Sequence, residues 1–125
     1  MVKYLSDEWL ERAAAALGSA PVPDDAEMVV QYEVSGGGNG KVRYVLKVEG
    51  GTATIVPGKQ PDAPVTFTLD YDTAVAVVTG ELSAQVAFMQ GRMKLAGDVR
   101  VLIDGAAALA AVHDTLGDLR ADTEY

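Results

Sequence analysis

The chain has 125 residues, of which 49% are apolar, so we expect a single domain over residues 1–125 with a hydrophobic core. It contains no cysteine, which excludes disulfides, thiolate metal ligands and a cysteine nucleophile. Its formal net charge is −8 and no basic cluster stands out, so phosphate backbones and anionic membrane surfaces should repel it. We therefore expect no nucleic-acid partner and no strong binding to anionic membranes.

The N-terminal segment predicts an amphipathic helix over Ser6–Leu17. Ser6 suits the N-cap position, and Leu5 and Leu10 can form a hydrophobic staple around it. Gly18 follows the last helical residue, as is typical of a helix end. Acidic residues interrupt this segment too often for a secretory signal, and no run of about 18 apolar residues occurs in the chain. We expect a cytoplasmic location.

The middle of the chain changes to a periodicity of two, which is typical of half-buried strands. Met28, Val30 and Tyr32, for example, alternate with more polar neighbours. The glycine-rich segment 35–40 predicts a hairpin loop, and the glycine pair 50–51 predicts a second turn. The four expected strands are 28–34, 42–48, 52–56 and 65–69. Taken in order, they predict an antiparallel meander with one buried face.

Segment 73–79 is ambiguous, because its valines and threonines are also common in buried strands. Its two ends favour a helix. Asp70 or Asp72 can cap the start of this helix, and Gly80 can end it. We therefore expect a short helix that follows the fourth strand.

Three further elements complete the chain. Ser83–Gln90 predicts a short helix capped by its serine, and the alternating segment 93–95 predicts a fifth strand. Asp98 opens a last helix, in which Gly105 costs about 1 kcal/mol relative to alanine. The apolar face of this helix comprises Val99, Leu102, Ile103, Ala106, Leu109 and Ala110.

The residues that could carry chemistry lack the partners that the chemistry needs. Segment 36–40 is not a phosphate-binding loop, because Val42 stands where a P-loop has Ser or Thr. His113, the single histidine, has no recognisable activated serine beside it. Asp70 and Asp72 are explained better as helix caps than as cation ligands, which would need several more oxygens. We therefore expect no catalytic residue, no metal, no cofactor and no enzymatic activity.

Two pieces of the sequence form a recognisable pattern, Val-Thr-Gly-Glu-Leu at 78–82 and Ala-Phe-Met-Gln-Gly-Arg-Met-Lys-Leu-Ala-Gly-Asp at 87–98. Together they resemble the signature of the sterol carrier protein 2 family. The resemblance implies an α+β fold, a five-stranded mainly antiparallel sheet with helices covering one face. It also implies an apolar tunnel between sheet and helices for fatty acids, acyl-CoA, phospholipids or sterols.

The resemblance points to non-enzymatic binding and intracellular carriage of such lipids. We expect the tunnel to be lined by apolar side chains from the first helix, the quoted pieces and the last helix: Trp9, Val78, Phe88, Met89, Met93, Leu102, Ile103 and Ala106. An alternative with the same fold is a protein-interaction or dimerisation module whose interior is fully packed. A continuous cavity would favour the carrier, and a plugged interior would favour the module.

Overall fold

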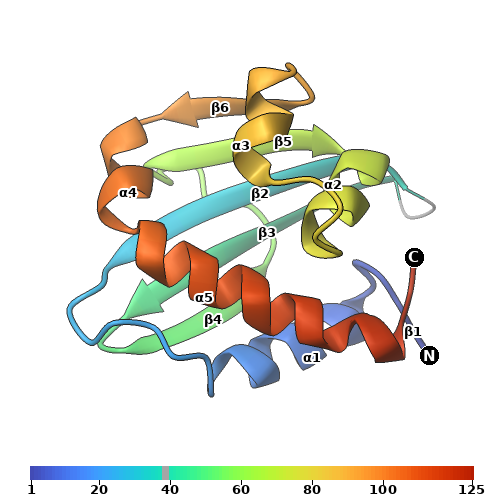
Figure 1. Cartoon of the computed structure of the whole chain (residues 1–125), viewed down its shortest axis with the longest axis horizontal. Coiled ribbons are helices and arrows are strands. Elements are labelled where there is room, and N and C mark those ends of the chain that lie inside the picture. The colour runs from blue at the N-terminus through green and yellow to red at the C-terminus, as the bar shows by residue number, and fades with distance from the viewer. Residues whose placement is uncertain (38–39) are drawn as a thin grey trace.

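The computed structural model describes residues 1–37 and 40–125, which form one five-stranded sheet with helices on one face (Figure 1). The expected α+β class is confirmed. The strands of the sheet are β2 (Met28–Gly37), β3 (Gly40–Glu49), β4 (Thr52–Pro57), β5 (Val65–Asp70) and β6 (Met93–Gly97). The helices are α1 (Asp7–Leu17), α2 (Tyr71–Val78), α3 (Ala84–Met89), α4 (Val99–Asp104), α5 (Ala106–Gly117) and the 3-10 helix η1 (Asp118–Asp122).

Side-chain caps set the starts of four helices. In each case an oxygen of the N-cap side chain accepts a hydrogen bond from a backbone N–H of the first turn, and these caps are Ser6, Asp70, Ser83 and Asp98. At α2 the cap is Asp70 rather than Asp72, because its Oδ1 lies 2.7 Å from the amide nitrogen of Thr73. The helical interpretation of the ambiguous segment is confirmed.

The strand order β4-β3-β2-β5-β6 corrects the predicted meander. β5 does not pair with β4 but lies parallel to β2, with Val30 opposite Val65 and Tyr32 opposite Phe67. All other neighbours in the sheet are antiparallel. The meander was wrong at this one joint because periodicity determines which face of a strand is buried, not which strand lies beside it.

The predicted hairpin loop 35–40 is shorter than expected. Pairing of β2 with β3 continues to Gly37 opposite Gly40, after an irregularity in register beyond Val34. Residues 38 and 39 lie outside the described residues. A side chain at Gly37 would meet the ring of Tyr71, since an added Cβ would lie 2.8 Å from its Cδ2.

The predicted last helix is two helices, α4 and α5, which meet at Gly105. The backbone of Gly105, with φ −96° and ψ 11°, leaves the helical region, and its Cα faces Met28. Because the helix changes direction here, the expected apolar face does not stay on one side. Val99 and Ile103 are exposed, whereas Ala108, Val112 and Leu116 on α5 are buried.

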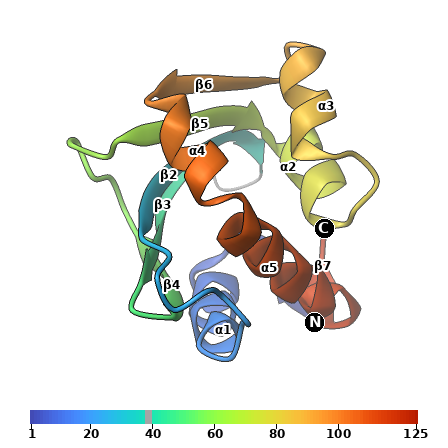
Figure 2. The same cartoon turned by 60° about the vertical axis from the view of Figure 1, so that its left-hand side comes forward.

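The two ends of the chain lie side by side. β1 (Val2–Lys3) pairs in parallel with β7 (Thr123–Glu124), and the amide of Tyr4 donates a hydrogen bond of 2.9 Å to the carbonyl of Glu124. Two views show α5 beside α1, with the paired ends next to them (Figure 1, Figure 2). This pairing places the N-terminal segment against the core.

Candidate functional site

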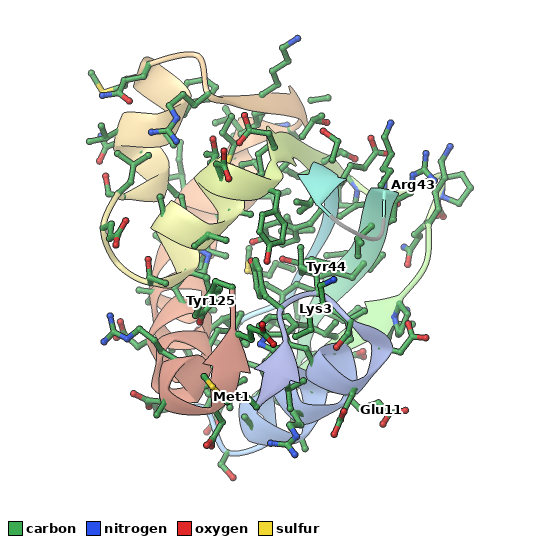
Figure 3. All side chains as sticks on the ribbon, turned by 90° about the vertical axis from the view of Figure 1, so that its right-hand side faces the viewer. Met1, Lys3, Glu11, Arg43, Tyr44 and Tyr125 are labelled. Atoms are coloured by element: carbon green, nitrogen blue, oxygen red, sulfur yellow. The ribbon has the colours of Figure 1, made fainter. Side chains whose placement is uncertain are left out.

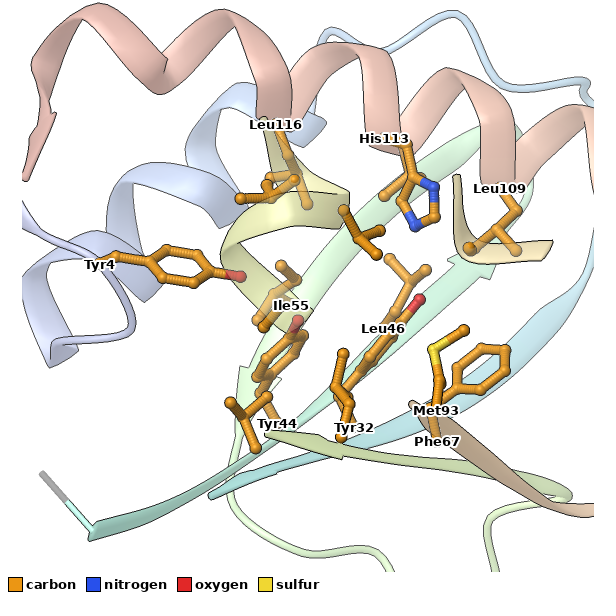
Figure 4. Close-up of a pocket in the computed structure, with 17 residues that line it drawn as sticks. Tyr4, Tyr32, Tyr44, Leu46, Ile55, Phe67, Met93, Leu109, His113 and Leu116 are labelled. Atoms are coloured by element: carbon orange, nitrogen blue, oxygen red, sulfur yellow. The ribbon is translucent and has the colours of Figure 1, made fainter. Parts of the chain in front are cut away.

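A cavity lies between the inner face of the sheet and helices α2 and α5, with Tyr4 at one end (Figure 4). Its volume is about 50 Å³. The sheet contributes Tyr32, Val34, Tyr44, Leu46, Ile55, Phe67, Leu69 and Met93. The N-terminal segment and the helical layer contribute Tyr4, Ala74, Val77, Val78, Ala84, Leu109, Val112, His113 and Leu116. The lining is apolar except for the tyrosine hydroxyls and the histidine.

Strand alternation and register place an aromatic group at the floor of this cavity. Tyr32 on β2 lies directly opposite Tyr44 on β3, and their rings stack with centroids 4.9 Å apart and planes at 12°. On the other side, Tyr32 lies next to Phe67 of β5 with centroids 5.4 Å apart. Because the two tyrosines leave the same face of the sheet, both rings project toward the helices (Figure 4).

The third tyrosine reaches the cavity from the N-terminal segment. Tyr4 is 3% exposed and packs edge-to-face on Trp9, with centroids 4.8 Å apart. Tyr125 covers its outer side at 5.2 Å, and Figure 3 shows Tyr125 and Met1 on this side of the molecule. Leu5 has a left-handed φ of 64°, which turns the chain between Tyr4 and the start of α1.

The polar groups of the cavity are uncharged at neutral pH. Burial raises the pKa of Tyr4, Tyr32 and Tyr44 well above the ordinary value of 10, so each keeps its hydroxyl proton. Burial also lowers the pKa of His113, although the neighbouring carboxylate of Asp114 opposes this shift. The site can therefore form neutral hydrogen bonds, but it offers no permanent charge.

The structure places two of the sequence-predicted site residues in the cavity lining, Val78 of α2 and Met93 of β6. Trp9 is buried in the core and packs against the ring of Tyr4, but it does not line the cavity. These three residues thus lie at or next to the cavity.

The other five predicted residues lie away from the cavity lining. Phe88, Met89 and Ile103 are exposed, with 51%, 75% and 68% of their surface accessible. Ala106 is also exposed, and Leu102 is half-buried without lining the cavity. The reason lies in the break at Gly105: α4 turns away there, so that of the two helices α4 and α5 only α5 contributes to the cavity lining.

Sequence reasoning missed the aromatic part of the lining. Tyr32 and Tyr44 lie at inward positions of two alternating strands, but nothing local to either strand indicates that their rings border a cavity. A signal was present nonetheless, since two of the four strands carry a tyrosine, a polar-tipped aromatic residue, at an inward position. His113 of α5, considered above only as a catalytic candidate, also borders the cavity.

Within residues 1–37 and 40–125, no three His, Asp or Glu side chains come together in a way that could hold a metal ion. None of the helices in these ranges is both long and apolar enough to cross a bilayer. The feature that remains for function is the apolar cavity with its neutral hydrogen-bonding groups.

Residues 6–109 match the family model described as the SCP-2 sterol transfer family. This match spans most of the chain and includes both pieces that carry the sequence resemblance. The chain belongs to this family. Membership suggests lipid binding or transfer and implies a lipid ligand.

The members of the family that are similar to this domain include sterol carrier protein 2 of Rattus norvegicus, which is 31% identical over 72 residues. The match covers 57% of this chain but only 13% of that protein, so the chain spans a small part of the length of such relatives. A crystal structure of sterol carrier protein 2 has a TM-score of 0.73 at 20% identity, covering 92% of this chain and 98% of the other. Palmitated SCP2L2 of Aedes aegypti has a TM-score of 0.63 at 24% identity, with 86% and 94% covered.

The same fold also occurs within an enzyme. The sec-alkylsulfatase Pisa1 from Pseudomonas sp. has a TM-score of 0.51 at 21% identity, and the similar region covers 85% of this chain but 14% of the sulfatase. The fold is thus found in small proteins and as a part of a larger one.

Proposed function

We propose that this SCP2 domain binds the apolar part of a lipid in the cavity beneath α2 and α5 and carries it without chemical change. The observation that supports this most directly is the lining, which is apolar apart from three phenol hydroxyls and one imidazole. The palmitated state of the Aedes aegypti relative supports a lipid as the occupant of this fold. Each methylene taken out of water contributes about 0.8 kcal/mol, so an acyl chain can bind with few polar contacts.

A long chain needs more room than the cavity holds at rest. A volume of about 50 Å³ accommodates a few water-sized groups. Binding therefore requires the helical layer to move away from the sheet. Gly105 is the natural joint for this movement, because α5 begins there without a side-chain cap and with non-helical backbone angles.

The test is a pair of matched tryptophan substitutions. Val78→Trp places a large ring in the cavity from a half-buried position, and Val86→Trp places the same ring on the exposed side of α3. Delipidated wild-type protein should bind palmitate with one-to-one stoichiometry in native mass spectrometry. We expect Val78→Trp to weaken this binding at least about tenfold, the effect of about 1.4 kcal/mol, and Val86→Trp to leave it unchanged.

Two results would contradict the proposal that the domain carries lipid in this cavity. One is wild-type protein that forms no adduct with palmitate, a phospholipid or cholesterol. The other is equal palmitate affinity in wild-type protein and Val78→Trp when the circular dichroism of the variant confirms that it is folded. The second result would place lipid binding elsewhere on the domain.

A second candidate function is the interaction or dimerisation module. It is favoured by exposed apolar side chains on the two short helices, which are Val86, Phe88 and Met89 on α3 and Val99 and Ile103 on α4. Light scattering separates the two candidates, because the carrier is expected to be a monomer at micromolar concentration.

The single-domain organisation of residues 1–125 and the cytoplasmic location stay predictions.

A further inference from the structure

The apolar cavity carries hydrogen-bonding groups that have no hydrogen-bond partner among the described residues. The hydroxyls of Tyr4, Tyr32 and Tyr44 lie on side chains that are at least nine-tenths buried. Figure 4 shows the rings of Tyr32 and Tyr44 directed away from the sheet, toward the helix that carries His113. Among the described residues, no hydrogen bond was found that involves these three hydroxyls or the imidazole.

Such groups cost free energy in an apolar cavity unless something inside it pairs with them. A pure hydrocarbon occupant would displace any water and offer no replacement, so it would leave the phenols unmatched. An ionised carboxylate or phosphate would be held only by neutral donors. No Lys or Arg lies among the lining residues, and burial keeps the His113 imidazole neutral by lowering its pKa. An uncharged oxygen can form hydrogen bonds with the phenols, and it needs no positively charged residue in the lining.

We propose that the cavity selects an uncharged lipid that carries a hydroxyl or ketone oxygen and binds this oxygen between Tyr32, Tyr44 and His113. The inference rests on the proposed lipid-carrier function and narrows its ligand class. A ketone accepts hydrogen bonds from the two phenols, and an alcohol can both accept from a phenol and donate to the imidazole. The stacked arrangement of Tyr32 and Tyr44, with rings 4.9 Å apart, brings the two phenol groups to the same side of the sheet.

The experiment compares four probes of equal chain length at pH 7.5: tetradecan-1-ol, 2-tetradecanone, tetradecanoate and tetradecane. Each competes with diphenylhexatriene, a hydrocarbon fluorophore that reports occupancy of the cavity without hydrogen bonding. We expect the alcohol and the ketone to bind wild-type protein about tenfold more tightly than tetradecane or tetradecanoate, as expected for one or two hydrogen bonds.

The deciding variant is Tyr32→Phe with Tyr44→Phe, which removes two hydroxyls and keeps both rings. It should weaken binding of the alcohol and the ketone about tenfold and leave the affinity for diphenylhexatriene unchanged. The control is Tyr71→Phe with Tyr125→Phe, which removes two hydroxyls outside the cavity lining and should change none of the affinities. The two single variants, Tyr32→Phe and Tyr44→Phe, repeat the test if the double variant loses its circular dichroism spectrum.

The outcomes separate this inference from the function on which it rests. If all four probes bind wild-type protein equally, if tetradecanoate binds most tightly, or if the double variant keeps the wild-type affinity for the alcohol, the oxygen selectivity is overturned and the lipid carrier stands. If neither diphenylhexatriene nor any of the four probes binds, both proposals are overturned.

Discussion

The backbone amide of Gln60 donates a hydrogen bond of 2.6 Å to Oε1 of Gln31, on the face of the sheet opposite the cavity. The Nε2 group of Gln31 donates to the hydroxyl of Thr66 on the parallel strand, at 3.3 Å. Gln31 is only 4% exposed, so one buried amide joins β2, β5 and the connection that carries the chain from β4 to β5. This connection is the one that allows the parallel pairing.

Gln31→Leu should destabilise the domain, because it removes both hydrogen bonds and leaves the Gln60 amide unpaired. We expect the free energy of unfolding in urea to fall by about 1–3 kcal/mol. Gln85→Leu, on the exposed side of α3, is the matched control and should change it by less than about 0.5 kcal/mol. Equal stability of the two variants would contradict a structural role for the Gln31 amide.

Asp70→Ala should weaken the start of α2, since the Asp70 carboxylate accepts the hydrogen bond from the Thr73 amide. The expected loss is about 1 kcal/mol. Asp72→Ala serves as the control, because Asp72 lies in the first turn without capping it. The hydrogen bond lowers the pKa of Asp70, so its stabilisation is present above the ordinary value of 3.8 and is lost as the pH falls below it. Urea unfolding at pH 6 and pH 3 measures both effects, and the stability difference between wild-type protein and Asp70→Ala should be smaller at pH 3.

Gly97→Ala should be among the most damaging single substitutions in β6. Gly97 has φ of 113°, and an added Cβ would collide with the carbonyl of Pro64, where it would lie 2.9 Å from the carbonyl carbon. Gly91 also has a positive φ, of 75°, but an added Cβ there meets nothing within 4 Å. We expect a loss of about 2–4 kcal/mol for Gly97→Ala and about 1 kcal/mol for Gly91→Ala. Thermal unfolding that ranks them in the opposite order would contradict this account.

Stability should fall between pH 7.5 and pH 5.5 because of His113. Burial lowers its pKa in the folded state, so the unfolded chain binds a proton below the ordinary value of 6.5 while the folded protein still resists it. His113 is the single histidine, so His113→Gln should remove most of the pH dependence in this range. Urea midpoints of both proteins at the two pH values provide the measurement. An unchanged pH dependence in His113→Gln would show that other groups cause it.

The local parts of the fold could be predicted from the sequence because their causes are local. A cap such as Ser6 and its partner Trp9 lie three residues apart, and the alternation that buries Tyr32 and Tyr44 lies within single strands. The pairing of β5 with β2 could not be predicted in this way. It is accompanied by the hydrogen bond between Gln31 and Gln60, which are 29 residues apart and carry no periodic signal.

The residues that line the candidate site could be predicted from the sequence only where they lie within a single recognisable segment of the chain. Val78 and Met93 lie within the pieces that resemble the family signature, and both line the cavity. Ile103 was expected beside them because an unbroken helix would put it on the same face as Leu109. The helix instead breaks at Gly105, which lies against Met28 from a distant part of the chain. The periodicity of a single helix carries no information about such a long-range contact.

The pairing of Val2 with Thr123 has a practical consequence for the design of these experiments. Both ends leave the domain at one place, beside Tyr4, which closes one end of the cavity. An affinity tag or a fused domain joined at either end would lie close to Tyr4 and to this end of the cavity. Binding measurements therefore need protein from which the tag has been removed. For the same reason, a short linker between the two ends would give a circular permutant with a new opening in a distant turn, such as Gly50-Gly51.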